Sequence, residues 1–175
     1  MNFTEADTRA KLIDPTLHRR GWTEDLIRRE ETDRGIDIVE GMPRRRQKGR
    51  IDYLLRIRIN ALSYPVAIAL IEAKRSNDPP DKGIEQAKKY ARLNHVPFIF
   101  SSNGHLFVEY DSFTGKTSAP RPLEEFPTPS EVRKRYEKGI GISLDNEGAK
   151  PLIASYPGGE ASRRYYQDAA IRASL

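Results

Sequence analysis

The chain has 175 residues, 37% hydrophobic and 31% charged, which suits one globular domain with a buried core. It has no cysteine, which excludes disulfides and thiolate metal sites, and it has no run of roughly 18 apolar residues that would span a membrane. We therefore expect a cytoplasmic protein with no membrane partner. The net charge of +5 permits an acidic partner such as a nucleic acid without requiring one.

The N-terminal segment predicts a helix, followed by a short strand and a basic loop. Thr4 is a candidate N-cap, Pro15 should kink or divide the helix, and Gly21 should end it. After a predicted strand at 36–39, the densest positive charge lies in a loop formed by Arg44, Arg45, Arg46, Gln47, Lys48, Gly49 and Arg50. This loop is a candidate contact for an acidic partner such as a nucleic acid, although most charge runs are simply solvated surface.

The central segment predicts a mixed sheet flanked by helices, which is an α/β fold. Residues 51–59 and 65–74 read as strands that pair as an antiparallel hairpin about a turn at 60–63. The remaining core elements are expected to be a helix at 83–93, a strand at 97–101, an Asn103-Gly104 turn and a return strand at 106–110.

Composition divides the chain into three parts. Residues 1–117 form the expected core domain. Residues 118–159 are first Pro-rich and later Gly-rich around a short helix at about 130–138, and we expect them to be a connector. Residues 160–175 predict a further helical segment.

Two carboxylates are expected to meet on the predicted hairpin. Asp52 lies near the start of one strand and Glu72 near the end of the other, so an antiparallel pairing opposes them, and Lys74 shares the face of Glu72. One reading is a surface ion pair at strand ends, worth about 0–1 kcal/mol. The other is a Mg²⁺ site held by Asp52 and Glu72, with the Ala73 carbonyl as a third candidate ligand and Mn²⁺ as a possible substitute, because two opposed carboxylates repel unless a cation lies between them. Such a site would activate water for attack on phosphorus, with Lys74 placed to stabilise charge.

The spacing of these residues resembles the PD-(D/E)XK nuclease superfamily. Glu72 follows Asp52 by twenty positions and Lys74 follows by two more, while Ile51 stands where the short motif has proline. Gln86 and Tyr90 match the Gln-x-x-x-Tyr signature that accompanies the catalytic strand in RecB-like and type I nucleases; the less favoured alternative is a polar rim with the tyrosine packed on the core.

The N-terminal stretch extends the resemblance to the R (HsdR) subunits of type I restriction enzymes. The segment from Thr4 to Leu17, the pair Gly21-Trp22, and the segments 97–104 and 126–129 are all similar to that family. Glu5 then becomes a candidate metal or water ligand, against the alternative of a favourable carboxylate in a helix first turn.

This resemblance implies a restriction-endonuclease-like core and a Mg²⁺-dependent DNA endonuclease. It also implies partners, namely double-stranded DNA and the modification and specificity subunits of a restriction-modification complex. The alternative is a catalytically silent module that binds DNA or docks subunits.

The segment around Gln167 resembles the start of the helicase-like motor, where this glutamine reads the adenine of ATP. Because no phosphate-binding loop occurs in the sequence, we expect a fragment cut inside the motor, with ATP bound only by the full-length parent.

Overall fold

A long N-terminal helix changes its winding in the middle. The computed structural model describes residues 2–32, 36–39, 42–45, 50–59 and 65–146, and its first elements are α1 (Glu5–Thr8), a π-helical segment (Arg9–Ile13) and α2 (Asp14–Arg19). The Thr4 hydroxyl caps α1 by accepting from the Asp7 amide at 3.2 Å. The wide π turn precedes Pro15, which has no amide hydrogen to donate and whose ring displaces the carbonyl four residues earlier. The helix therefore adapts to the proline, as predicted.

The main sheet is mixed, as the sequence predicts. Its order is β1-β4-β5-β6-β7-β8 with β9 also paired to β7, and β5 and β6 are parallel whereas the other pairs are antiparallel. The strands are β1 (Ile27–Thr32), β4 (Arg50–Ile57), β5 (Val66–Ala73), β6 (Phe98–Ser102), β7 (Leu106–Asp111), β8 (Lys116–Thr117) and β9 (Arg121–Pro122).

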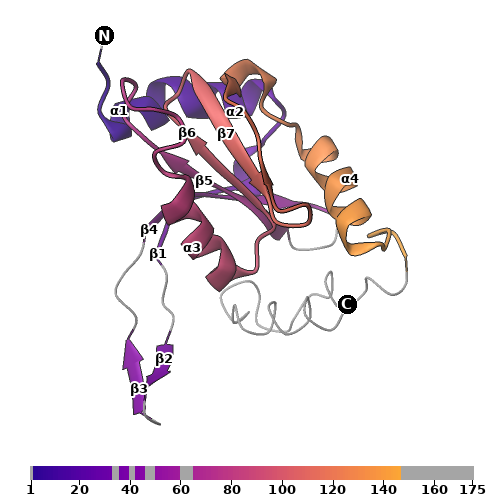
Figure 1. Ribbon diagram of the computed structural model, residues 1–175. Helices are drawn as coiled ribbons and strands as arrows, with labels where there is room; N and C mark the ends of the chain where they lie inside the picture. The colour runs from indigo at the N-terminus through magenta and orange to yellow at the C-terminus, as the bar shows by residue number, and fades with distance from the viewer. Residues whose placement is uncertain (1, 33–35, 40–41, 46–49, 60–64, 147–175) are drawn as a thin grey trace.

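Four strands differ from the sequence prediction, and two of them are the short strands β8 and β9, which it did not include. The edge strand β1 was not predicted, and β3 (Met42–Arg45) occupies the first part of what was expected to be a basic loop. β3 pairs with the predicted β2 (Ile36–Val39) as a separate two-stranded ribbon that projects beyond the ends of β1 and β4 (Figure 1). The predicted turn at 60–63 lies outside the described residues.

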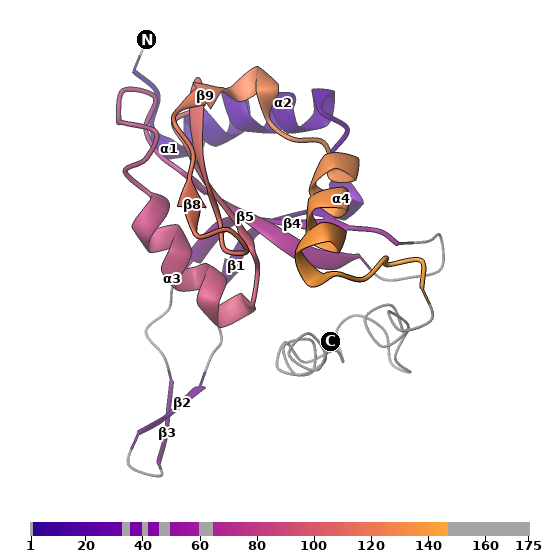
Figure 2. The ribbon, with the colours of Figure 1, turned by 45° about the vertical axis from the view of Figure 1, so that its right-hand side comes forward.

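The two faces of the main sheet are covered by different helices. One face packs on α3 (Ile84–Asn94), and the small apolar cluster between them comprises Ile51, Leu70, Ile84, Ala87, Ala91 and Ile99. The other face carries the large core, which the π-helical segment, α2 and α4 (Pro129–Ile140) cover, as the turned view in Figure 2 shows. In the described ranges no helix has both the length and the apolar character needed to cross a membrane.

The first part of the expected connector belongs to the packed domain. Its apolar side chains enter the large core alongside Trp22, namely Leu123, Phe126, Val132, Tyr136 and Leu144. The Trp22 indole N–H also donates to the Pro127 carbonyl at 2.9 Å. A capping box between Thr128 and Glu131 starts α4. The chain after residue 117 is therefore part of the core up to Leu144.

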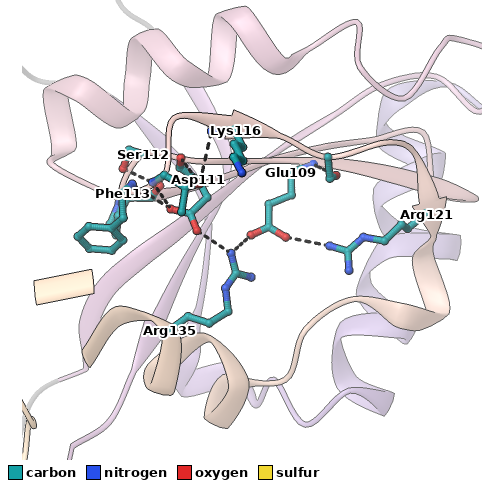
Figure 3. Close-up of polar contacts among 10 residues, drawn as sticks. Glu109, Asp111, Ser112, Phe113, Lys116, Arg121 and Arg135 are labelled. Carbon is teal, nitrogen blue, oxygen red and sulfur yellow. Dashed lines mark hydrogen bonds and ion pairs between the residues drawn. The ribbon is translucent and has the colours of Figure 1, made fainter. Parts of the chain in front are cut away.

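A buried ion-pair network fixes α4 against the sheet. Glu109 on β7 is 5% exposed, and its carboxylate receives Arg121 at 2.8 Å on one oxygen and Arg135 from α4 on the other (Figure 3). Arg135 also reaches Asp111 at 3.3 Å and stacks over the Phe98 ring at 4.5 Å. Since both oxygens of the buried carboxylate are satisfied, the network ties α4 to β7 instead of forming an open site.

Candidate active site

The strand register places Asp52 and Glu72 beside each other. Tyr53 pairs with Ile71 in the β4–β5 hairpin, so the same register continued by one residue sets Asp52 opposite Glu72. Side chains alternate along a strand, which puts both carboxylates on the sheet face covered by α3. Ser101 on β6 pairs with Glu72 from the other side. The structure thus brings together the two carboxylates that the sequence singled out.

The Asp52 carboxylate is held at both oxygens. Its Oδ2 accepts from the Ala73 amide at 2.9 Å, and its Oδ1 lies 3.3 Å from Nη1 of Arg9. Burial raises the pKa of Asp52 above its ordinary value, and the Ala73 amide and the Arg9 charge offset only part of this effect. The two contacts therefore fix the orientation of the Asp52 carboxylate, while burial makes its ionised form less stable than it is in water.

Glu72 is the most desolvated acid of the cluster. It is 4% exposed, and its Oε1 accepts from the Lys74 ammonium at 2.9 Å. Its Oε2 is buried and has no hydrogen-bond partner among the described residues. Burial, reinforced by the negative charge of Asp52, raises the pKa of Glu72 to about 7 even though Lys74 opposes the change. A buried oxygen left without a partner is costly unless a ligand satisfies it.

Lys74 connects three of the predicted site residues. Its ammonium is 2.9 Å from Glu72, 3.5 Å from the Gln86 amide oxygen and 3.9 Å from Glu5 at the start of α1. Burial alone would lower the pKa of Lys74, but the bond to Glu72 and the nearby acids outweigh burial and raise it. Lys74 therefore remains a charged donor at neutral pH.

Gln86 and Tyr90 have different surroundings although they lie one helical turn apart on α3. Gln86 is exposed and its amide oxygen faces Lys74, so it lies at the edge of the site. The Tyr90 ring is half-buried and packs against the small apolar cluster under α3. The structure brings Gln86 to the carboxylates and gives Tyr90 a packing contact.

Three further residues belong to the site and were not among the sequence-predicted set. Arg9 contacts Asp52, and its only sequence signal was its place one turn after Glu5. Ser101 is fully buried and accepts the Gly83 amide at 3.1 Å, just before α3 begins. A Cβ added at Gly83 would lie 2.7 Å from atoms of Glu72, Lys74 and Ser101, so only glycine lets α3 approach this closely.

The pair Asp52 and Glu72 suits a divalent cation. A buried and a partly buried carboxylate on one face, the first with an unsatisfied oxygen and both with raised pKa values, are stabilised when a cation neutralises them. In the part of the chain that the structure describes, no group of three or more His, Cys, Asp or Glu side chains is arranged around a common metal position. A cation here would depend on two carboxylates, with water or the backbone as its other ligands, and the role of the Ala73 carbonyl stays a prediction.

The predicted DNA-binding residues are only partly described. Arg44 and Arg45 fall in β3, whereas Arg46 and Lys48 lie outside the described residues, as does Gln167. Arg50 is the exposed first residue of β4 and forms an ion pair with Glu30 on β1.

No protein-family model matches the chain, but two known proteins are similar to it over nearly its whole length. An Escherichia coli protein named type I restriction enzyme EcoAI endonuclease subunit is 31% identical over 183 aligned positions, which cover 99% of this chain and 22% of that protein. A solved fragment described as an HsdR subunit of a type I restriction enzyme from Vibrio vulnificus YJ016 is 34% identical, with a TM-score of 0.75 over 99% of this chain and 32% of that one. This chain therefore spans about a fifth of the first relative and about a third of the second. Over that shared stretch, the chain is a homologue of the HsdR endonuclease subunits of type I restriction enzymes.

Proposed function

We propose that this domain hydrolyses DNA phosphodiester bonds with Mg²⁺, as the endonuclease part of a restriction-modification complex. The observation that supports this most is the cluster of Asp52, Glu72 and Lys74. Glu72 and Lys74 are buried beside the partly buried Asp52 on one sheet face, and one Glu72 oxygen has no protein partner among the described residues. A purely structural ion pair would gain little from a second buried carboxylate, because burying charge costs more than pairing usually returns.

Each residue has a separate task in this proposal. Asp52 and Glu72 hold Mg²⁺, or Mn²⁺ in its place, and the bound cation supplies Lewis-acid stabilisation of charge on the phosphodiester oxygens. Lys74 keeps its proton and donates to an attacking water or to the phosphate. Gln86 accepts one of the Lys74 hydrogens and so limits the directions in which the ammonium points.

The partners in this proposal follow from the family resemblance, and the description of both relatives as subunits of type I restriction enzymes supports assembly into a complex. The substrate is double-stranded DNA, and the modification and specificity subunits assemble with the longer protein that contains this domain. ATP is used by that longer protein and not by the residues described here. The complex acts in the cytoplasm. The alternative, a silent DNA-binding or docking module, predicts no metal-dependent change in the domain.

The test is cleavage of plasmid DNA by an R subunit that carries this sequence, assembled with its partner subunits and ATP. Asp52→Asn keeps the size of the side chain and an oxygen for the Ala73 amide, but it removes the charge. Lys82→Ala is the matched control, because Lys82 is exposed and, within the described ranges, its ion pair is with the nearby Asp78 at 2.8 Å. We expect cleavage by the wild type and the control and none by Asp52→Asn. Cleavage that persists in Asp52→Asn would refute the proposal.

A further inference from the structure

An ion-pair chain runs from the edge strand β1 to the Asp52 carboxylate. Nη1 of Arg9 lies 3.1 Å from Oε1 of Glu30 and 3.3 Å from Oδ1 of Asp52, so one nitrogen bridges the two acids. The Arg9 side chain is 19% exposed and Asp52 17%, whereas Glu30 is 49% exposed. The contact to Asp52 is therefore largely desolvated, which strengthens it relative to a surface pair.

The backbone at Glu30 is held in an unfavourable conformation. Its φ is +59°, and among the described non-glycine residues only His95, at a helix end, shares a positive φ. The flanking pairs Arg29–Tyr53 and Glu31–Ile51 keep one register, so Glu30 stands directly across from Asp52. A side chain in this region costs free energy and persists where its surroundings require it, which is common at functional sites.

Arg9 also occupies an unusual backbone position. It is the first residue of the π-helical segment between α1 and α2, and such wide turns are frequent at functional sites. The irregular helix and the strained strand come together beside Asp52, because Arg9 contacts the Asp52 carboxylate and Glu30 contacts Arg9. Pro15 accounts for the π turn, whereas no neighbouring glycine or proline accounts for the positive φ at Glu30, so the strained residue opposite Asp52 is the stronger sign of a functional constraint.

We propose that Arg9 is a positioning residue for Asp52 and that Glu30 holds Arg9 in place. Asp52 is then fixed from two directions, by the Ala73 amide on Oδ2 and by Arg9 on Oδ1. This inference rests on the proposed function, because its purpose is to orient Asp52 toward a divalent cation. Partners that orient a ligand typically change metal affinity or activity by about 10–100-fold when they are removed.

Calorimetric titration of the 175-residue chain with Mn²⁺ tests this role. Removing the Arg9 charge would by electrostatics alone tighten the binding of a cation. Loss of positioning predicts the opposite, so we expect about tenfold weaker binding in Arg9→Gln. Arg9→Lys should recover most of the affinity, since a single nitrogen makes both contacts. Arg58→Gln is the control, because Arg58 lies after β4 and pairs with Asp25 at 3.0 Å.

A double variant shows whether Glu30 acts through Arg9. We expect Glu30→Gln to weaken Mn²⁺ binding on its own and to have no further effect in the Arg9→Gln background. Electrostatics alone predicts opposite single effects that cancel in the double variant. Thermal unfolding then tests the strain. Both Glu30→Gly and Glu30→Ala remove the carboxylate, but only glycine accepts the positive φ, so the glycine variant should melt about 3 °C higher than the alanine variant.

The outcomes separate this inference from the proposed function. If the wild type binds Mn²⁺ and Arg9→Gln binds it equally or more tightly while still folded, the positioning role is wrong and the proposed function stands. If the alanine variant at Glu30 melts at or above the glycine variant, the strain argument is wrong. If the folded wild type does not bind Mn²⁺, both the proposed function and the positioning role are wrong.

Discussion

The raised pKa of Glu72 predicts an unusual pH dependence of stability in the metal-free domain. Burial raises this pKa from its ordinary 4.5 to about 7, so the folded state binds a proton that the unfolded state releases. The contribution of Glu72 to the free energy of unfolding is therefore fully present below about pH 4.5, and it is lost as the pH rises through about 7. At about 1.4 kcal/mol per pKa unit, the difference corresponds to about 3 kcal/mol. Asp52, whose pKa burial also raises, changes stability in the same direction.

Urea unfolding of the 175-residue chain in the presence of a chelator measures this effect. We expect the free energy of unfolding to fall by about 3 kcal/mol between about pH 5 and about pH 8 in the wild type, and much less in Glu72→Gln, which cannot ionise. The exposed acid Glu24, whose pKa its bond to Arg29 lowers to about 2, acts only at lower pH and does not interfere. A flat or rising stability of the wild type over this range, or an equal slope in Glu72→Gln, would refute the reasoning.

Three further predictions concern the neighbours of Glu72. In the assembled restriction complex, Lys74→Ala should abolish DNA cleavage and leave ATP-driven translocation intact, and loss of both activities would mark Lys74 as structural. Gln86→Ala should reduce cleavage and change the melting temperature by less than about 2 °C, because Gln86 is exposed; a large drop would favour a packing role. Gly83→Ala should destabilise the domain by about 1–3 kcal/mol in urea unfolding, because its Cβ would lie 2.7 Å from Glu72, Lys74 and Ser101, and an unchanged midpoint would contradict the close packing of α3.

The sequence was sufficient for the elements whose patterns are local. The β4–β5 hairpin could be predicted because apolar runs flank a short turn, and antiparallel pairing then sets Asp52 opposite Glu72. The edge strand β1 was missed because Ile27 is followed by Arg, Arg, Glu, Glu and Thr, a polar run without apolar alternation. Polar side chains are common on edge strands, where one side of the backbone is not covered by another strand.

The parts that were missed depend on contacts between distant segments. The Pro-rich stretch after residue 117 has the composition of a linker, yet Leu123 and Phe126 enter the large core. The contact of Arg9 with Asp52 joins residues far apart in the sequence, so no local pattern signals it. A glycine before a helix is common and by itself signals no function. The need for glycine at position 83 becomes clear only when the structure places the start of α3 against Glu72.

The central claim is that Asp52 and Glu72 together hold a divalent cation. Its most direct test is calorimetric titration with Mn²⁺ at about pH 8, where metal competes least with protons. The wild-type chain, Asp52→Asn, Glu72→Gln and the control Glu124→Gln, which changes an exposed acid, should be compared under the same conditions. The account predicts one binding event in the wild type and the control, and at least about tenfold weaker binding in each of the other two variants. Equal affinity in all four chains, or no binding by the folded wild type, would contradict it.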